Sequence, residues 1–299
     1  MVSGASRNSG SDRANLLALL GLGIIWGSSF LFIKLAVRTV PPITLATVRV
    51  LLAAISLCIV LRVRKLRLPR FGSTWAVFLL VGLLNGALPF TLISAAEIYI
   101  DSGLAAILNA SMPIFTIFIA HFLTSDERLT WLRVAGVLVG LSGVVVLVGP
   151  EALYGIGTNF WAQMAVVGAA LSYALGAILG RRFLKGYPAV ISATGQFIGG
   201  AVILIPFSLF VDSPWTLRPS WTALGALASL SLLGTSFAYL LYYYLLKNAG
   251  ATYTSLVTYL LPLTGVLWGV LLLGENLRWQ ALLAMALILG GVALSGKRR

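Results

Sequence analysis

Ten long apolar segments follow one another along this chain and leave no place for a soluble fold. Each is close to the roughly 20 residues that a helix needs to cross the hydrocarbon core of a bilayer. Only 10% of the residues are charged and 59% are hydrophobic, whereas a soluble domain has roughly 25% charged residues. The bilayer must therefore be the solvent of this protein. The segments are residues 16–37, 43–61, 75–94, 102–123, 130–148, 159–180, 188–210, 221–246, 251–273 and 279–295.

One stretch occurs twice, about 148 residues apart. Pro113 precedes a Glu-x-Leu-x-Trp sequence at 127–131, and Pro262 precedes another at 275–279. Each is followed by an apolar segment rich in small residues. The match extends upstream, where Trp26 corresponds to Tyr173. Two copies of one unit therefore fill the chain.

These copies predict the domain organisation. We expect a disordered cytoplasmic N-terminus (1–14), a first repeat (15–149), a periplasmic linker (150–158), a second repeat (159–296) and a basic cytoplasmic C-terminus (297–299). Each repeat contains five of the ten segments, and because five is odd, the second repeat enters the membrane from the opposite side. The predicted fold class is an all-α integral membrane protein with ten transmembrane helices in two inverted five-helix repeats. Such repeats are typical of secondary transporters, whose substrate site lies near the midplane between the repeats.

Lysine and arginine predict the orientation, because they concentrate in cytoplasmic loops. With both termini in the cytoplasm, sixteen of the 21 basic residues lie on the inner side. The five in the outer half are Lys34, Arg38, Arg49, Arg218 and Arg278. The net charge of +13 is thus mostly a topology signal. The basic residues lie between hydrophobic segments and form no groove with aromatic residues, so we expect no nucleic-acid partner.

Several short sequences resemble the two ends of an EamA-type repeat. Those at the start are Trp26-Gly27-Ser28-Ser29-Phe30, Lys34, Pro41-Pro42 and Arg49, and those at the end run from Pro113 to Glu127 and from Pro262 to Glu275. From residue 16 to 295 the chain is similar to ten-helix EamA proteins of the drug/metabolite transporter superfamily, and among these to the YddG-type exporters of aromatic and other amino acids. The second copy departs from the pattern at Tyr173-Ala174 and Gln196. The resemblance implies amino acid export across a bacterial inner membrane.

Polar and aromatic groups at membrane depth are candidates for the substrate path, because they are expensive there. They avoid the fifth and tenth segments, which we expect to be peripheral. The alternative for each is a hydrogen bond or packing contact between helices. The candidates are Trp26, Ser29, Asn85, Asn109, Tyr173, Tyr239, Tyr243, Thr258 and Tyr259.

Asn109 shares one helical stripe with Ser102 and Thr116 at seven-residue spacing, and Thr258 is its equivalent in the second repeat. This facing pair suits a substrate ammonium or carboxylate. Tyr242 and Tyr244 are instead assigned to the aromatic belt at the membrane surface.

Three prolines lie within the segments and each removes a backbone hydrogen-bond donor. Pro89, Pro113 and Pro262 are therefore candidate hinges or gates, with a static bend as the alternative. Arg49 lies deep in the second segment and needs a partner, for which Glu97 or Asp101 are candidates. Lys34 is expected to extend to the headgroups.

All eight acidic residues fall in loops or at segment ends. We therefore predict a facilitator (uniporter) working by alternating access, with proton-coupled antiport as the alternative. A multidrug or cation exporter on the same fold is a second candidate. The chain has one histidine, His121, and no motif for metal or ATP, so we expect no enzyme, cofactor or metal. A non-transporting scaffold would not explain the uneven distribution of polar residues. The predicted partners are a small-molecule substrate and the lipid bilayer, and a monomer is favoured.

Overall fold

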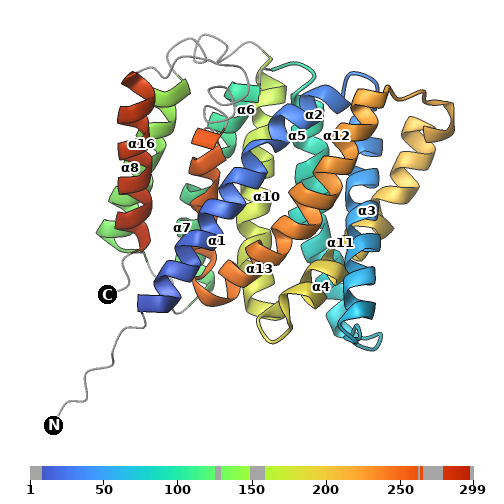
Figure 1. The fold of residues 1–299 in the computed structure, drawn as a ribbon, viewed down its shortest axis with the longest axis horizontal. Helices are drawn as coiled ribbons and strands as arrows, with labels where there is room; N and C mark the ends of the chain where they lie inside the picture. The colour runs from blue at the N-terminus through green and yellow to red at the C-terminus, as the bar shows by residue number, and fades with distance from the viewer. Residues whose placement is uncertain are drawn as a thin grey trace.

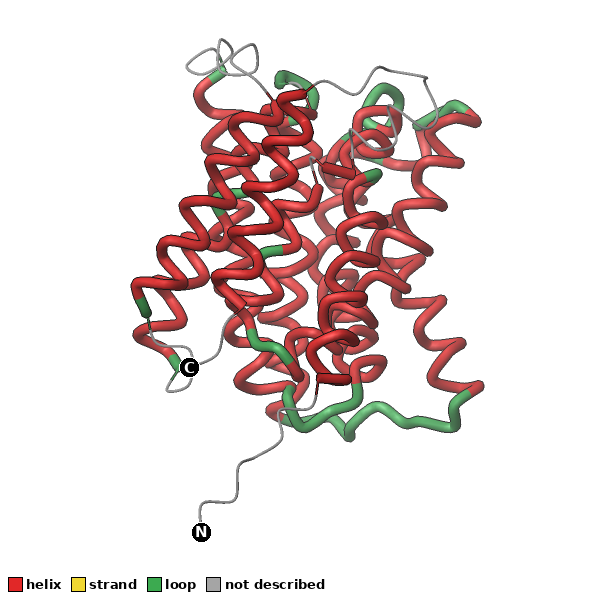
Figure 2. Tube along the Cα trace, turned by 60° about the vertical axis from the view of Figure 1, so that its left-hand side comes forward, coloured by secondary structure: helices red, strands yellow, loops and turns green. Residues whose placement is uncertain are grey.

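The computed structural model describes residues 9–100, 102–124, 129–148, 159–261, 263–264 and 279–296. Every regular element in these ranges is helical (Figure 2). Seven helical segments there are long and apolar enough to cross a membrane, and two shorter apolar helices accompany them. The prediction of an all-helical membrane protein is confirmed. The predicted ninth span lies partly outside these ranges, so the count of ten helices and the cytoplasmic location of the termini stay predictions.

Two of the spans in the first repeat are interrupted. The helices are α1 (Ser9–Gly27), α2 (Ser29–Ala36), α3 (Pro42–Val63), α4 (Ser73–Gly82), the π-helical η1 (Leu83–Ala87), α5 (Leu88–Ala96), α6 (Ser102–Asn109), α7 (Met112–Leu123) and α8 (Trp131–Val148). α1 and α2 form one span, as do α6 and α7. Residues 9–14, predicted to be disordered, are part of α1.

The second repeat begins with an uninterrupted span. Its helices are α10 (Phe160–Leu184), α11 (Ala189–Phe207), the π-helical η2 (Ser208–Asp212), the short η3 (Pro214–Thr216), α12 (Trp221–Ser231), the π-helical η4 (Leu232–Phe237), α13 (Ala238–Asn248), α14 (Ala251–Ser255) and α16 (Trp279–Gly296). The whole of the predicted linker 150–158, together with Pro262 and the residues from 265 to 278, lies outside the described residues.

Equivalent helices of the two repeats run in opposite directions. The start of α3 lies beside the end of η2. There the Thr44 backbone N–H and the Thr44 hydroxyl both donate to the Asp212 carboxylate, at 2.7 and 2.8 Å. This carboxylate also complements the positive end of the α3 dipole. α10 begins at the same end of the bundle, where Asn159 donates to the Tyr99 carbonyl at 3.0 Å. In Figure 1, α1 begins and α16 finishes at the opposite end.

Several helix contacts made by one repeat have an equivalent contact made by the other repeat. α1 contacts α13 and α2 contacts α12, whereas the equivalent α10 contacts α4 and α5. α3 contacts its own counterpart α11, and α8 contacts its counterpart α16. This is the contact pattern that a pseudo-two-fold axis requires. α8 and α16 form a separate layer at one edge (Figure 1).

Glycines allow some of these pairs to approach closely. A Cβ on Gly199 of α11 would clash with the Phe78 carbonyl oxygen of α4, and one on Gly82 would lie 2.5 Å from the Gly200 nitrogen. In the α8–α16 pair a Cβ on Gly136 would lie 2.7 Å from the Gly291 oxygen. Small residues at such contacts are the usual basis of helix association in membranes, where the hydrophobic effect does not drive it.

The third and eighth spans each contain a π turn, η1 and η4, and the two begin at equivalent positions of the repeats, Leu83 and Leu232. A π turn breaks the regular i→i−4 ladder and occurs often at functional sites. Pro89 follows η1 and supplies no backbone N–H, which suits a turn whose ladder is already broken.

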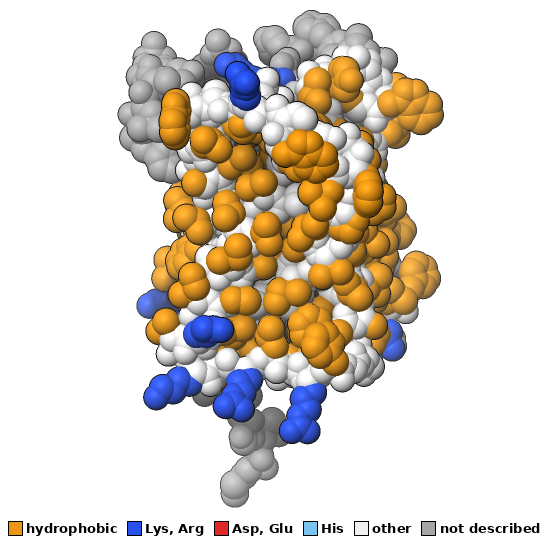
Figure 3. Space-filling view, turned by 90° about the vertical axis from the view of Figure 1, so that its right-hand side faces the viewer, with side chains coloured by type: hydrophobic (Ala, Val, Ile, Leu, Met, Phe, Trp, Pro, Cys, Tyr) orange, Lys and Arg blue, Asp and Glu red, His pale blue; other side chains and the backbone are white. Residues whose placement is uncertain are grey.

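Hydrophobic side chains cover the surface of the bundle between two charged ends. Figure 3 shows them as a broad band, with Lys and Arg at the lower end of this face and a smaller group at the upper end. Trp221 and Phe210 are 88% exposed, which is favourable only against lipid. This face matches the charge asymmetry seen in the sequence.

We expect Gly199→Ala to lower the melting temperature of the purified protein in detergent, because the new methyl meets backbone atoms of α4 that have no flexible side chain to move. Over-packing of this kind costs about 1–3 kcal/mol. Gly225→Ala is the control, because a Cβ there meets nothing within 4 Å. A melting temperature that falls equally in both variants would contradict the close α4–α11 contact.

Candidate functional site

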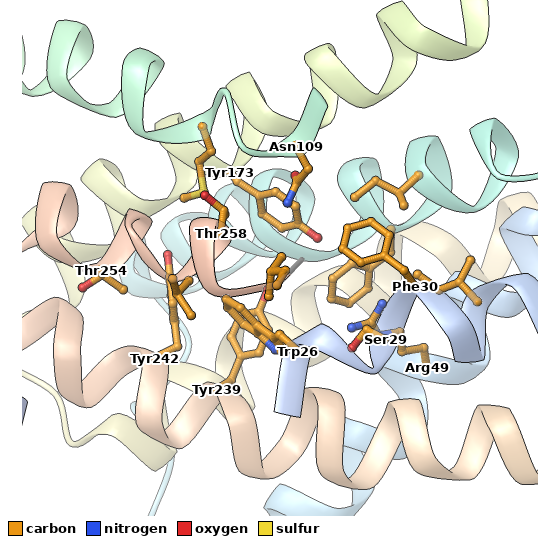
Figure 4. Close-up of a pocket in the computed structure, with 16 residues that line it drawn as sticks. Trp26, Ser29, Phe30, Arg49, Asn109, Tyr173, Tyr239, Tyr242, Thr254 and Thr258 are labelled. Carbon is orange, nitrogen blue, oxygen red and sulfur yellow. The ribbon is translucent and has the colours of Figure 1, made fainter. Parts of the chain in front are cut away.

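A cavity of about 60 Å³ lies where the two repeats meet, and both contribute to its wall. Six of the nine predicted substrate residues line it: Trp26, Ser29, Asn109, Tyr173, Tyr239 and Thr258. Figure 4 shows them approaching one space from separate helices. α8 and α16 contribute nothing to its described lining, as the polar-residue distribution indicated. The substrate role of the six remains a prediction.

Aromatic rings build one wall of the cavity. The Trp26 ring lies 5.6 Å from that of Tyr239 and 5.9 Å from that of Tyr242. Phe90 and Tyr173 pair on another side at 6.4 Å. Centroid separations of this size are typical of favourable aromatic pairs. The wall can therefore contact an apolar or aromatic group.

The π turn η4 holds the first-repeat side of the site. Trp26 donates from Nε1 to the Gly234 carbonyl at 2.8 Å, and Arg49 donates from Nε to the Thr235 hydroxyl at 2.8 Å. Thr235 in turn donates to the Leu230 carbonyl at 2.7 Å, so its oxygen is free to accept. Trp26 thus satisfies a backbone carbonyl of the irregular turn, as burial in a membrane requires, and the Thr235 side chain of the same turn orients Arg49.

Asn85, a predicted substrate residue, lies behind the cavity wall and does not line it. It belongs to the other π turn, η1. The backbone carbonyl of Asn85 accepts a hydrogen bond from the Tyr239 hydroxyl at 2.6 Å, and its side-chain Nδ2 donates to the Tyr242 hydroxyl at 3.3 Å. Asn85 therefore positions two lining tyrosines.

Two further predicted substrate residues point elsewhere. Tyr243 donates to Gln196 Oε1 at 2.5 Å, between α13 and α11. Tyr259 donates to the Val137 carbonyl at 2.9 Å, and its ring packs on Gly140 of α8. Neither lines the cavity. Both make the interhelical contacts that were the alternative reading of their positions.

Two of the three predicted hinge prolines, Pro89 and Pro113, lie beside residues of the cavity wall. Pro89 precedes Phe90, and Pro113 follows Met112 at the break between α6 and α7; both neighbours line the cavity. Pro262 lies outside the described residues, although the preceding Leu261 lines the cavity. A bend at Pro89 or at Pro113 would therefore move a lining side chain.

Ten of the sixteen lining residues were not among the predicted substrate residues, and three of them show why. Tyr242 is only 3% exposed and lines the cavity, so its assignment to the surface belt was wrong. Arg49 also lines the cavity, and its partners are Thr235 and the Phe90 ring, whose centroid lies 3.7 Å from the guanidinium carbon. The signal for Arg49 was its depth in an apolar span. Phe90 carried no signal, because an apolar ring is unremarkable there.

Lys34 and Glu97 lie together at the end of the bundle where α2 and α5 finish. Lys34 Nζ donates to the backbone carbonyls of Glu97 and Ile100, at 2.7 and 3.1 Å. It therefore pairs within the protein and does not extend to the headgroups as predicted. The Glu97 side chain is fully buried and accepts a hydrogen bond from Ser102 at 3.2 Å. Burial raises the pKa of Glu97 from 4.5 to about 8, although Ser102, Lys34 and Arg49 oppose the shift.

Comparison with known proteins places both halves in one family. The profile of the EamA-like transporter family matches residues 13–149 and again 160–296. The chain is 31% identical over 279 residues to the uncharacterized inner membrane transporter YedA of Escherichia coli K12, covering 93% of this chain and 89% of YedA. It is 23% identical to the uncharacterized transporter YoaV of Bacillus subtilis, covering 94% of this chain and 96% of YoaV.

An archaeal relative and a solved structure agree with this. An uncharacterized transporter of Archaeoglobus fulgidus is 30% identical over 292 residues, which is 95% of this chain and 98% of the relative. A crystal structure superposes with a TM-score of 0.75 at 20% identity, covering 97% of this chain and 98% of that one. At this identity the solved structure supports the fold alone.

We expect the melting temperature of the wild-type protein to fall as the pH rises from 5 to 8. The folded protein keeps the Glu97 proton up to about pH 8, whereas the unfolded chain releases it near 4.5, so raising the pH favours unfolding by up to about 1.4 kcal/mol per pH unit. Glu97→Gln should flatten this decline. The melting temperature across pH in detergent checks it, and equal slopes in wild type and variant would contradict the buried, protonated state.

Proposed function

The chain belongs to the EamA-like transporter family, and on that premise we propose that it exports neutral and aromatic amino acids and related small metabolites. We place it in the bacterial inner membrane, the membrane that the name of its relative YedA gives for that protein. The cavity is built from the helices of one chain, which supports a monomer as the transporting unit.

The observation that carries the proposal is the chemistry of the cavity. Its wall combines aromatic rings with uncharged polar side chains and one cation, Arg49. A phosphorylated substrate would call for several basic groups at this depth. An apolar or aromatic amino acid needs an apolar surface for its side chain and a few polar groups for its ends. The lining supplies both.

The size and position of the cavity support alternating access. A cavity of about 60 Å³ holds only a few waters at roughly 10–15 Å³ each, so an amino acid can enter only if the wall moves. Equivalent helices run in opposite directions around the cavity, and two repeats in this relation can exchange conformations. The α6–α7 break and the π turns η1 and η4 supply places at which spans can bend.

We propose transport down the substrate gradient, because no carboxylate belongs to the described lining of the cavity. A proton-coupled carrier usually keeps an acid on the substrate path. Glu97 is buried one helical turn beyond the lining residue Ile93, at the end of the span.

A multidrug or cation exporter is the second candidate, and the aromatic wall alone would suit it. Arg49 is the observation against it. A fixed cation in a small cavity of low dielectric repels a cationic substrate, and the described lining has no acidic group to offset this.

We expect purified protein in proteoliposomes to catalyse counterflow of labelled neutral and aromatic amino acids without an imposed proton or sodium gradient. Asn109→Ala should reduce uptake by at least about fivefold, because a polar group facing the substrate is lost. Thr116→Val is the matched control. Thr116 is fully buried, lies seven residues after Asn109 on the same helical stripe, and among the described residues its hydroxyl bonds only the Met112 carbonyl of its own helix.

Three results would contradict parts of the proposal. Uptake that needs an imposed ion gradient would rule out the facilitator. Efflux of organic cations without amino acid counterflow would favour the second candidate. Equal activity of Asn109→Ala and Thr116→Val would remove Asn109 from the substrate path.

A further inference from the structure

Arg49 brings a buried positive charge to the cavity. The residue is 4% exposed and lies seven residues into α3, roughly 10 Å from the start of the helix at 1.5 Å per residue. Its Nε is bonded to Thr235, and the Phe90 ring covers one face of the guanidinium. These two contacts hold the group in one orientation, which Figure 4 shows directed toward Ser29.

Most of the hydrogen-bonding capacity of this group is unused. A guanidinium has five N–H donors, and among the described residues only the bond from Nε has an acceptor. Buried charges are normally paired, because an unpaired one is costly. Glu97 does not supply the pair: its Oε2 accepts from Ser102, and its Oε1 has no hydrogen-bond partner among the described residues. Because Arg49 lines the cavity, its two terminal nitrogens suit an anionic group of a ligand.

Two further polar atoms of the lining lack partners within the described part of the chain. They are Oγ of Ser29 and Oδ1 of Asn109, and both are buried. An amide oxygen accepts hydrogen bonds, whereas a hydroxyl can donate one. Buried polar atoms are normally satisfied. Neither of these two has surface open to the closed cavity, so a ligand would reach them when the wall moves.

We propose that the cavity recognises the zwitterionic end of an α-amino acid. The carboxylate pairs with the terminal nitrogens of Arg49 and accepts a hydrogen bond from Ser29. The ammonium donates to Oδ1 of Asn109, and the side chain of the substrate faces the rings of Trp26 and Tyr239. The inference rests on the proposed function and narrows it: the carboxylate is required, and the ammonium adds to binding.

The test compares three ligands that differ in one group each. Phenylalanine, 2-phenylethylamine without the carboxylate, and 3-phenylpropionate without the ammonium compete with labelled phenylalanine in the counterflow assay. If the transported substrate is aliphatic, leucine, isopentylamine and 4-methylpentanoate replace them. We expect the amine to compete at least about tenfold less well than the amino acid, because it leaves Arg49 unpaired. The des-amino acid should lie between the two.

Variants assign each end of the substrate to its residue. Arg49→Gln should weaken phenylalanine and 3-phenylpropionate together and so reduce the discrimination against the amine. Asn109→Ala should narrow the gap between phenylalanine and 3-phenylpropionate and leave the discrimination against the amine intact. Arg38→Gln removes an exposed cation near the same end of the bundle and should change neither ratio. The ratios within one variant do not depend on its expression level.

Each outcome decides one question. Amino acid transport with equal competition by the amine in the wild type would overturn this inference and leave the proposed function standing. Transport of 3-phenylpropionate without any amino acid would overturn the proposed function and the ammonium site, while the Arg49 site would stand. If Arg49→Gln does not fold, the wild-type ratios still decide whether the carboxylate is required. Unchanged ratios in a folded Arg49→Gln protein would overturn the assignment to Arg49.

Discussion

The need to pair every backbone polar group inside a bilayer governs this structure. Regular helices meet that need by themselves, but the π turns η1 and η4 break the ladder in the third and eighth spans. Carbonyls in these turns accept hydrogen bonds from Trp26 and Tyr239, two side chains of the cavity wall. These two turns thus lie beside the cavity, and the side chains that donate to their carbonyls belong to its wall.

These turns also show what the two repeats share and where they differ. The two turns begin at equivalent positions, so the repeats share the framework around the cavity. The side chains on that framework differ. Arg49 of the first repeat lines the cavity, whereas Gln196, at the equivalent position of the second repeat, accepts a hydrogen bond from Tyr243 and does not line it. A symmetric scaffold suits the exchange of conformations, whereas an asymmetric lining can hold a substrate with two different ends.

Sequence patterns located part of the site and misplaced the rest for one reason. Depth in an apolar span identifies a polar side chain as costly, and this was enough to find Asn109 and Thr258. Depth does not say what the side chain meets. Tyr242 and Tyr243 are neighbours on α13, yet only Tyr242 lines the cavity, and Tyr243 reaches Gln196. The rotation of the helix after a π turn decides between them, and periodicity does not contain that rotation.

The sequence by itself determined that this protein is an all-helical membrane protein of two repeats, because composition leaves no other solvent and the duplicated segments mark the copies. Tertiary structure alone decided which polar groups share one cavity. It gathers Trp26, Arg49 and Asn109 from spans far apart in the chain and buries Glu97 at the end of one. The physical reason is that solvent preference follows from local composition, whereas proximity follows from helix crossings and close glycine contacts between segments distant in sequence.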